Sequence, residues 1–376
     1  MRSTMKTSFA LLLLLCLTST AYSADLIILR NLSRIADRTV AAFNEDGVRL
    51  DNGRVVSWDA IERGRISEGQ AAFDKMLSEL GLPLYRIRQR LKVGDYPGVL
   101  EHAEKLYPRY AGRNSPTAYM VAQALMWGRL AQGRREEALE PYLMCYDYLR
   151  SLPPGTDLSA ILPGARRLKY HLESGLSLDL TPLWFDSQMA QKTLPGVLNT
   201  IRRMKAPRPA GTRIYYGSLA LAAGQDEQGA KIVQEMQTNQ RLLIELREIV
   251  LSQYDIRQNR ASDAADRLEP LIEDVTPENR PLALYWLGRA QTAAPQPKLA
   301  QEGALNLLHL PALYGRKRPE LAAAGLYHAM QALSRQGDSA GSVAIRKELL
   351  QHYGSTHHAQ LVRKQLSPSR DSEEKP

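Results

Sequence analysis

The sequence predicts a mostly α-helical protein, an α-solenoid of stacked antiparallel helix pairs, preceded by a small β-rich module. Two observations lead to this fold class. From about residue 66 onward, apolar residues recur at spacings of three and four, and glycine-containing turns interrupt them. Before residue 66, short β-prone runs alternate with Asp-Gly and Asn-Gly pairs, which favour tight hairpins. We therefore expect a β-rich module at 24–65, a helical-repeat domain at 66–366 and a disordered tail at 367–376.

The first 23 residues have the pattern of a secretory signal peptide. Arg2 and Lys6 provide positive charge, an apolar stretch follows, and Ala21 and Ser23 place small residues where a signal peptidase requires them. A membrane anchor is the alternative, but the apolar stretch is shorter than the roughly 20 residues that a spanning helix needs. We therefore expect a cleaved signal peptide at 1–23 and a periplasmic or secreted protein without an integral membrane span.

Composition and charge limit the function classes further. The chain has 376 residues, of which 44% are hydrophobic and 24% charged, so it can build a core. Two cysteines exclude a disulfide framework, and after signal removal Cys145 alone stays, where we expect a buried core thiol. The formal net charge is +9. In an exported protein this charge favours an acidic protein, an anionic envelope polymer or lipid head groups, and not nucleic acid, as the partner.

The β-rich module is predicted from turn signals between short apolar runs. Asp46-Gly47 and Asn52-Gly53 tolerate the positive φ that tight hairpins demand. The runs between them predict three or four strands, at 26–29, 39–43, 48–50 and 55–58.

The helical domain starts, in this prediction, with a helix capped by Ser67 with Gln70 as its reciprocal partner, and ended by Gly81 and Pro83. A second helix over 84–92 precedes the turn Gly94-Asp95-Tyr96. Proline-rich breaks are expected at 153–155, 163–164, 195–196, 207–209 and 295–297. Region 151–210 is the least repeat-like, and its extended apolar run 176–185 is predicted to cross between two parts of the array.

Several of these turns resemble the tetratricopeptide repeat (TPR). The resemblance is carried by Gly94-Asp95-Tyr96, by Gly133 with Ala138 five residues later, by Leu287-Gly288 and by Gly337-Asp338. In that family small residues stand where two helix axes approach too closely for a larger side chain. The resemblance covers residues 67–366. It departs from the family pattern at Gly229 and Pro295, which replace the Ala of the helix crossing and the turn Gly. It implies a right-handed TPR-like solenoid of the exported bacterial type.

The search for catalytic chemistry is mostly negative. The chain has no phosphate-binding loop, dinucleotide fingerprint, nucleophile elbow or HExxH zinc motif. We therefore expect no enzyme activity, no cofactor and no metal. His352, His357 and His358 lie near Glu348 in the sequence and could converge on a metal, but a solvated surface is the preferred interpretation.

A concentration of positive charge is the main functional signal. Residues 161–216 contain nine basic and three acidic residues. A solvated charged face is the ordinary interpretation of any one such cluster, whereas the concentration of charge in the one irregular region of a solenoid points to a partner-binding surface. The candidate partner-binding residues are Arg166, Arg167, Lys169, Arg202, Arg203, Lys205, Arg208 and Arg213. Trp184 and Phe185 in the same region are either a binding platform or, as we favour, a plug at the joint between two repeat blocks.

The leading hypothesis is a non-catalytic exported scaffold that binds a protein or an anionic polymer in the cell envelope. The first alternative is an exported α/α-type enzyme acting on envelope polysaccharide, for which Asp179 and Asp186 are the candidate carboxylates. The second alternative makes the β-rich module the functional unit and the helices a spacer.

Overall fold

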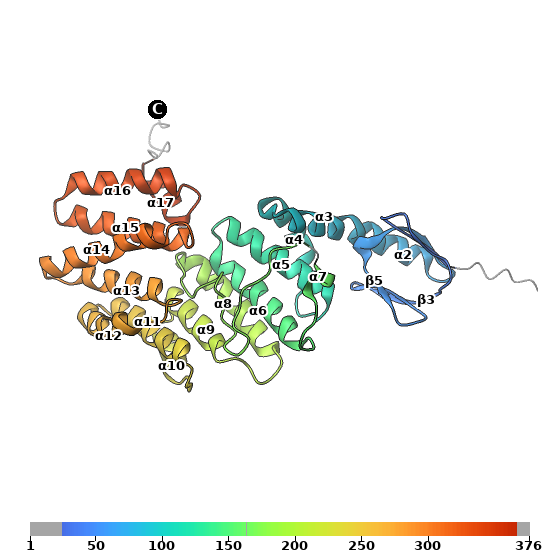
Figure 1. Ribbon diagram of the computed structural model, residues 1–376, viewed down its shortest axis with the longest axis horizontal. Helices are drawn as coiled ribbons and strands as arrows, with labels where there is room; N and C mark the ends of the chain where they lie inside the picture. The colour runs from blue at the N-terminus through green and yellow to red at the C-terminus, as the bar shows by residue number, and fades with distance from the viewer. Residues whose placement is uncertain (1–24, 163, 367–376) are drawn as a thin grey trace, which may run out of the picture.

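The computed structural model describes residues 25–162 and 164–366. In Figure 1 the β-rich module lies at one end of an elongated molecule, and helices fill the rest. No helix in the described ranges is long and apolar enough to cross a membrane. The predicted signal peptide at 1–23 and the predicted tail at 367–376 lie outside the described residues.

The β-rich module contains two antiparallel sheets of three strands each, with strand orders β2-β1-β6 and β3-β4-β5. The prediction of three or four strands was therefore too low, because it missed β2, which spans only two residues, and β6, whose sequence Ile-Glu-Arg-Gly-Arg lacks an apolar run. The predicted hairpin between β3 and β4 is confirmed, with Asn44 opposite Gly47. The strands are β1 (Leu26–Leu29), β2 (Arg34–Ile35), β3 (Val40–Asn44), β4 (Gly47–Leu50), β5 (Val55–Val56) and β6 (Ile61–Arg65).

A rod of helix joins this module to the array. It consists of α2 (Gln70–Met76), a π-helical turn (Leu77–Gly81) and α3 (Leu82–Val93). The prediction that Gly81 and Pro83 end a helix was wrong: one wide π turn accommodates the residue that lacks an N–H, and the helix continues. The predicted Ser67 cap was also wrong, since Gly69 occupies the N-cap.

The remaining helices form an array in which each long helix packs against the next one along the chain. A mostly helical repeat-like architecture is thus confirmed. The helices are α4 (Tyr96–Tyr110), α5 (Pro116–Ala131), α6 (Arg135–Ser151), α7 (Leu158–Ile161), α8 (Ser187–Arg203), α9 (Gly211–Ala222), α10 (Asp226–Gln234), α11 (Arg241–Arg257), α12 (Ala261–Asp274), α13 (Arg280–Ala293), α14 (Pro297–Tyr314), α15 (Pro319–Arg335), α16 (Ser339–His352) and α17 (His357–Leu366).

Glycine allows the tight turns and one of the close helix crossings in this array. Gly94 and Gly133 end their helices in the left-handed region, each with a φ of 73°, which suits a residue without a Cβ. At Gly288, a Cβ would lie 2.7 Å from the Leu307 side chain and 2.9 Å from the Gly303 carbonyl oxygen. The α13–α14 contact therefore depends on the missing side chain at Gly288, as the Leu-Gly pattern predicts.

We expect Gly288→Val to lower the free energy of unfolding by about 1–3 kcal/mol, because the new methyl groups overpack the α13–α14 contact. Chemical denaturation measures the change. Ala344→Val is a matched control on the exposed side of α16, where helix propensity alone costs at most about 0.7 kcal/mol. Equal effects of the two variants would contradict the close crossing.

The irregular region is shorter than the predicted 151–210. Residues 187–203 form the continuous helix α8, so the break predicted at Pro195-Gly196 was wrong. Residues 152–157 and 204–210 also lie outside helices; the longest irregular stretch, residues 164–186, is called the crossing segment below. It contains the predicted run 176–185, in which Leu180, Leu183 and Trp184 are buried.

Candidate functional site

Buried tyrosines hold the crossing segment between α6 and α9. The Tyr142 hydroxyl donates to the Gly175 carbonyl at 2.7 Å, and the Tyr215 hydroxyl donates to the Leu180 carbonyl at the same distance. These bonds give an extended backbone the partners that a helix or sheet would otherwise supply. One side of the crossing segment is therefore ordered against the core by these tyrosines. Its other side lines a cleft.

The end of the crossing segment contacts the last helix of the array. The Phe185 ring lies 4.6 Å from the His358 ring and 6.0 Å from the His357 ring, centroid to centroid. The backbone N–H of His357 also donates to the Glu320 carboxylate of α15 at 3.3 Å. Residues far apart in the sequence therefore contact one another here, and the start of α6 and the start of α15 both line one cleft.

The contact between Phe185 and His358 shows that the expectation of a solvated histidine surface was wrong for His358. His358 is 4% exposed, and burial lowers its pKa to about 3. Sequence alone placed it on the surface because the ring that covers it, Phe185, comes from another part of the chain. His352 is exposed, with Nε2 at 3.7 Å from the Glu348 carboxylate.

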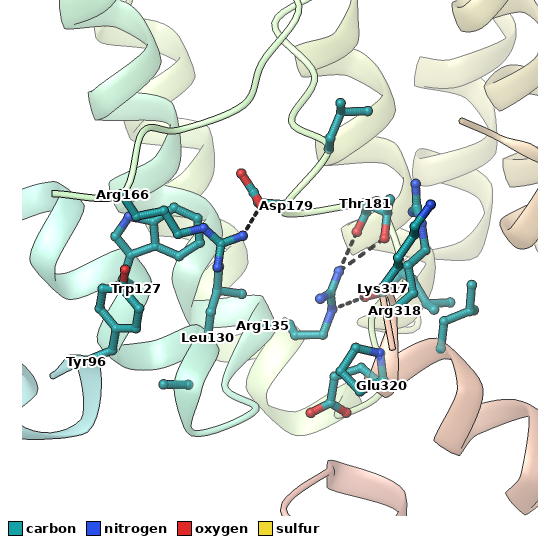
Figure 2. Close-up of a pocket in the computed structure, with 15 residues that line it drawn as sticks. Tyr96, Trp127, Leu130, Arg135, Arg166, Asp179, Thr181, Lys317, Arg318 and Glu320 are labelled. Atoms are coloured by element: carbon teal, nitrogen blue, oxygen red, sulfur yellow. Dashed lines mark hydrogen bonds and ion pairs between the residues drawn. The ribbon is translucent and has the colours of Figure 1, made fainter. Parts of the chain in front are cut away.

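The cleft has a volume of about 270 Å³ and lies between α5, α6, the crossing segment and the start of α15. Figure 2 shows Arg166 and Asp179 on one side of the cleft, Lys317 and Arg318 on the other, and Arg135 between them. Four cationic side chains and two carboxylates line it, together with apolar and aromatic groups. The charged lining residues are Arg135, Arg166, Asp179, Lys317, Arg318 and Glu320.

Arg135 is the most buried cation of the cleft, at 8% exposed. Its Nε donates to the Leu183 carbonyl at 3.2 Å, and its Nη2 donates to the Thr181 carbonyl at 2.9 Å. Both acceptors are neutral. Burial lowers the pKa of the Arg135 guanidinium, but an arginine stays charged in proteins. The crossing segment therefore orients a desolvated positive charge without neutralising it.

Arg318 adds a second guanidinium to the same space. Burial lowers its pKa, and the nearby charge of Arg135 acts in the same direction. Its Nη2 donates to the Glu278 carbonyl at 3.2 Å, which is again a neutral acceptor. Among the residues that the structure describes, no carboxylate oxygen lies within 4 Å of a charged nitrogen of Arg135, Lys317 or Arg318.

The opposite wall is already paired. The Arg166 Nη2 lies 2.5 Å from the Asp179 carboxylate, and its guanidinium carbon lies 4.2 Å from the centre of the Trp127 ring. The ion pair and the cation–π contact fix Arg166 over an apolar surface. This wall offers aromatic area, whereas the Arg135 side offers unpaired charge.

Glu320 is the second carboxylate of the cleft. Burial raises its pKa, while Arg135 and the His357 N–H act in the opposite direction. Because burial disfavours the ionised form of the Glu320 carboxyl, this group neutralises the arginines less than an exposed carboxylate would. The cleft therefore keeps a net positive character.

The structure divides the eight predicted partner-binding residues between two ends of α5. Arg166 lies over Trp127 near the end of α5, with Arg167 and Lys169 following in the crossing segment. Arg203 lies against Gly112, just before α5 begins. The rise of α5 separates these positions by about 18 Å. Around Arg203 the remaining members are exposed, namely Arg202, Lys205, Arg208 and Arg213.

Sequence reasoning missed Arg135, Lys317 and Arg318. The available signal was weak, since each follows a turn at the start of a helix, where a basic residue is ordinary. More than 180 positions separate Arg135 from Arg318. Their charge concentration arises only when α15 comes to lie beside α6.

The structure also places the other residues that the sequence analysis named, Cys145, Trp184 and Asp186. Cys145 is fully buried, and burial raises the pKa of its thiol, as expected for a core thiol. Trp184 is 6% exposed, and its Nε1 donates to the Ser218 hydroxyl at 2.8 Å. Asp186 caps α8 by accepting from the Met189 N–H and lines a different cavity from Asp179.

No group of three or more His, Cys, Asp or Glu residues in the described ranges could hold a metal ion.

No model of a known protein family matches the chain, and no curated protein matches it.

Proposed function

We propose that this protein is a non-catalytic, TPR-like scaffold, exported to the cell envelope, whose cleft binds an acidic segment of a partner protein. The observation that carries the proposal is the buried guanidinium of Arg135, held beside Arg318 with no carboxylate within 4 Å among the described residues. Burying unpaired charge costs free energy. A bound carboxylate would offset that cost and form charge-assisted, bidentate hydrogen bonds.

The other lining groups favour a peptide over a uniform polymer. Tyr96, Trp127 and Leu183 give the cleft aromatic and apolar surface beside its cations. A volume of about 270 Å³ accommodates a few side chains and not a long repeating unit. An acidic segment with an apolar residue next to its carboxylates fits both features, because the two kinds of side chain can occupy the two walls.

Binding of a labelled oligoglutamate peptide with one central leucine tests this proposal by fluorescence anisotropy. The double variant Lys317→Glu, Arg318→Glu should weaken binding by about 10- to 100-fold at low ionic strength, as expected for the loss of charge-assisted hydrogen bonds. High salt should weaken binding to the unmodified protein as well.

Arg316→Glu is the matched control, because Arg316 is exposed and adjacent in sequence but does not line the cleft. It should change the affinity by about twofold or less, as expected for a peripheral charge. An equal loss in both variants would show an effect of net charge alone and would contradict the cleft. A further comparator, Arg202→Glu with Arg203→Glu, reports on the second group of predicted residues.

Polygalacturonate, an anionic polysaccharide, is the competing probe. Under this proposal it binds more weakly than the peptide and does not depend on Arg318. Tighter binding of polygalacturonate that is lost with Arg318→Glu would instead assign the cleft to an anionic polymer. That result would overturn the choice of a protein segment while keeping the site.

The enzyme alternative now rests on Asp179 and Glu320, which share the cleft. The raised pKa of Glu320 is a property of general acids. Release of new reducing ends from envelope polysaccharide, abolished by Glu320→Gln, would replace the scaffold proposal by this one.

A further inference from the structure

A second cavity, of about 630 Å³, lies between α13, α15, α16 and α17, at the far end of α15 from the cleft. Three arginines line it: Arg289, Arg335 and Arg346. Its other lining groups include the hydroxyls of Thr292, Ser334 and Ser342. No aspartate or glutamate of the described chain is among the lining residues. The cavity is therefore rich in donors and positive charge.

The three guanidinium groups form no ion pair within the described residues. Within residues 25–162 and 164–366, no carboxylate oxygen lies within 4 Å of Arg289, Arg335 or Arg346. The protein contacts of Arg335 and Arg289 are to neutral groups: Arg335 Nε donates to the Gln331 carbonyl at 3.4 Å, and Arg289 Nη1 donates to the Tyr285 hydroxyl at 3.2 Å. Like charges that share a cavity repel each other, so an anion between them would relieve that repulsion.

His328 orients one of these arginines. Arginine can only donate, so the His328 Nε2 accepts from Arg289 Nη1 at 2.9 Å. His328 Nδ1 then carries the proton and donates to the Gln331 Oε1 at 3.3 Å. Burial and the charge of Arg289 lower the pKa of His328, which keeps the ring neutral. A fixed tautomer thus holds Arg289 in place, which preorganises this side of the cavity.

The donor set selects the chemistry of the ligand. Arginine forks match the several oxygens of a phosphate group and can bind two of them at once. Hydroxyl groups add neutral donors. The volume lies in the range of small-molecule sites, about 300–1,000 Å³, and is therefore too large for a single inorganic phosphate.

We propose that this cavity binds a small molecule with at least two phosphate-type negative charges, such as a condensed phosphate or an organic phosphate. This site is separate from the proposed acidic-segment cleft. Along α15 alone, about 22 Å separate Glu320 in the cleft from Arg335 in the cavity.

Isothermal titration calorimetry with inorganic pyrophosphate tests the site. The double variant Arg335→Gln, Arg346→Gln should lower the affinity by about tenfold or more, since it removes two charge-assisted contacts. Lys347→Gln is the matched control, because Lys347 is exposed on the same helix and does not line the cavity. The cleft variant Lys317→Gln, Arg318→Gln should leave this binding unchanged.

Citrate, a tricarboxylate of comparable charge, is titrated in parallel and should bind more weakly than pyrophosphate. Failure of pyrophosphate to bind the unmodified protein would overturn the proposal, as would an equal loss with Lys347→Gln. Equal affinity for citrate would overturn the phosphate class. Because the double variant removes exposed or partly exposed side chains, far-ultraviolet circular dichroism should confirm that it is folded.

Discussion

Replacing Trp184 by alanine should lower the free energy of unfolding by about 3–5 kcal/mol, one of the two largest effects that we expect. The indole is 6% exposed, and its Nε1 donates to the buried Ser218 hydroxyl on α9. Removal would leave a cavity where the crossing segment packs between two parts of the array. Urea denaturation followed by circular dichroism measures the loss.

Trp184→Phe separates packing from hydrogen bonding at this position. It keeps most of the apolar area and loses the bond to Ser218, so it should cost about 1–2 kcal/mol. The pair of variants also distinguishes a plug from a binding platform. A platform would show little change in stability together with a clear loss of oligoglutamate binding, and that outcome would contradict the packing role.

Acidification should produce the second large effect. The pKa of His358 is about 3 in the folded protein and 6.5 without burial. Below about pH 6.5 the unfolded chain takes up a proton that the folded protein does not accept. Stability should therefore fall by about 2 kcal/mol between about pH 7 and pH 5 from this residue alone. His357, whose pKa burial also lowers, acts in the same direction.

His358→Leu should reduce this dependence on pH. The variant leaves no donor or acceptor without a partner, because His358 Nδ1 has none in the folded protein. His352→Leu is the control for loss of a histidine at an exposed site. Thermal unfolding across this pH range gives the comparison. If the His358→Leu protein lost as much stability on acidification as the unmodified one, the buried neutral ring would be the wrong cause.

Local patterns predicted much of the fold. Turn pairs such as Asp46-Gly47 give the hairpin, and the positive φ of Gly94 and Gly133 confirms two helix ends. Prolines were the main source of error. Pro83 and Pro195 suggested helix ends, yet both lie within continuous helical segments. At Pro83 the wider π turn accommodates the missing N–H. At Pro195 the packing of α8 outweighs the lost hydrogen bond.

The candidate site was predictable only in part. Arg166 belonged to a basic region that is visible in the sequence, and the structure places it in the cleft. Arg135 and Arg318 line the same cleft although they are far apart in the sequence, and Phe185 makes a similar long-range contact with His358 of α17. That long-range contact leaves no periodic or local trace. Export and the repeat family stay predictions.

Hydrogen–deuterium exchange with saturating oligoglutamate tests the central claim, which is that the cationic cleft binds acidic segments, most directly. We expect slower exchange of backbone amides at two places that are separate in the sequence, around Asp179 to Leu183 and around Lys317 to Leu321, because both segments line the cleft. The Lys317→Glu, Arg318→Glu protein should show neither change. Protection confined to the 202–213 region, or no protection at either wall, would contradict the account.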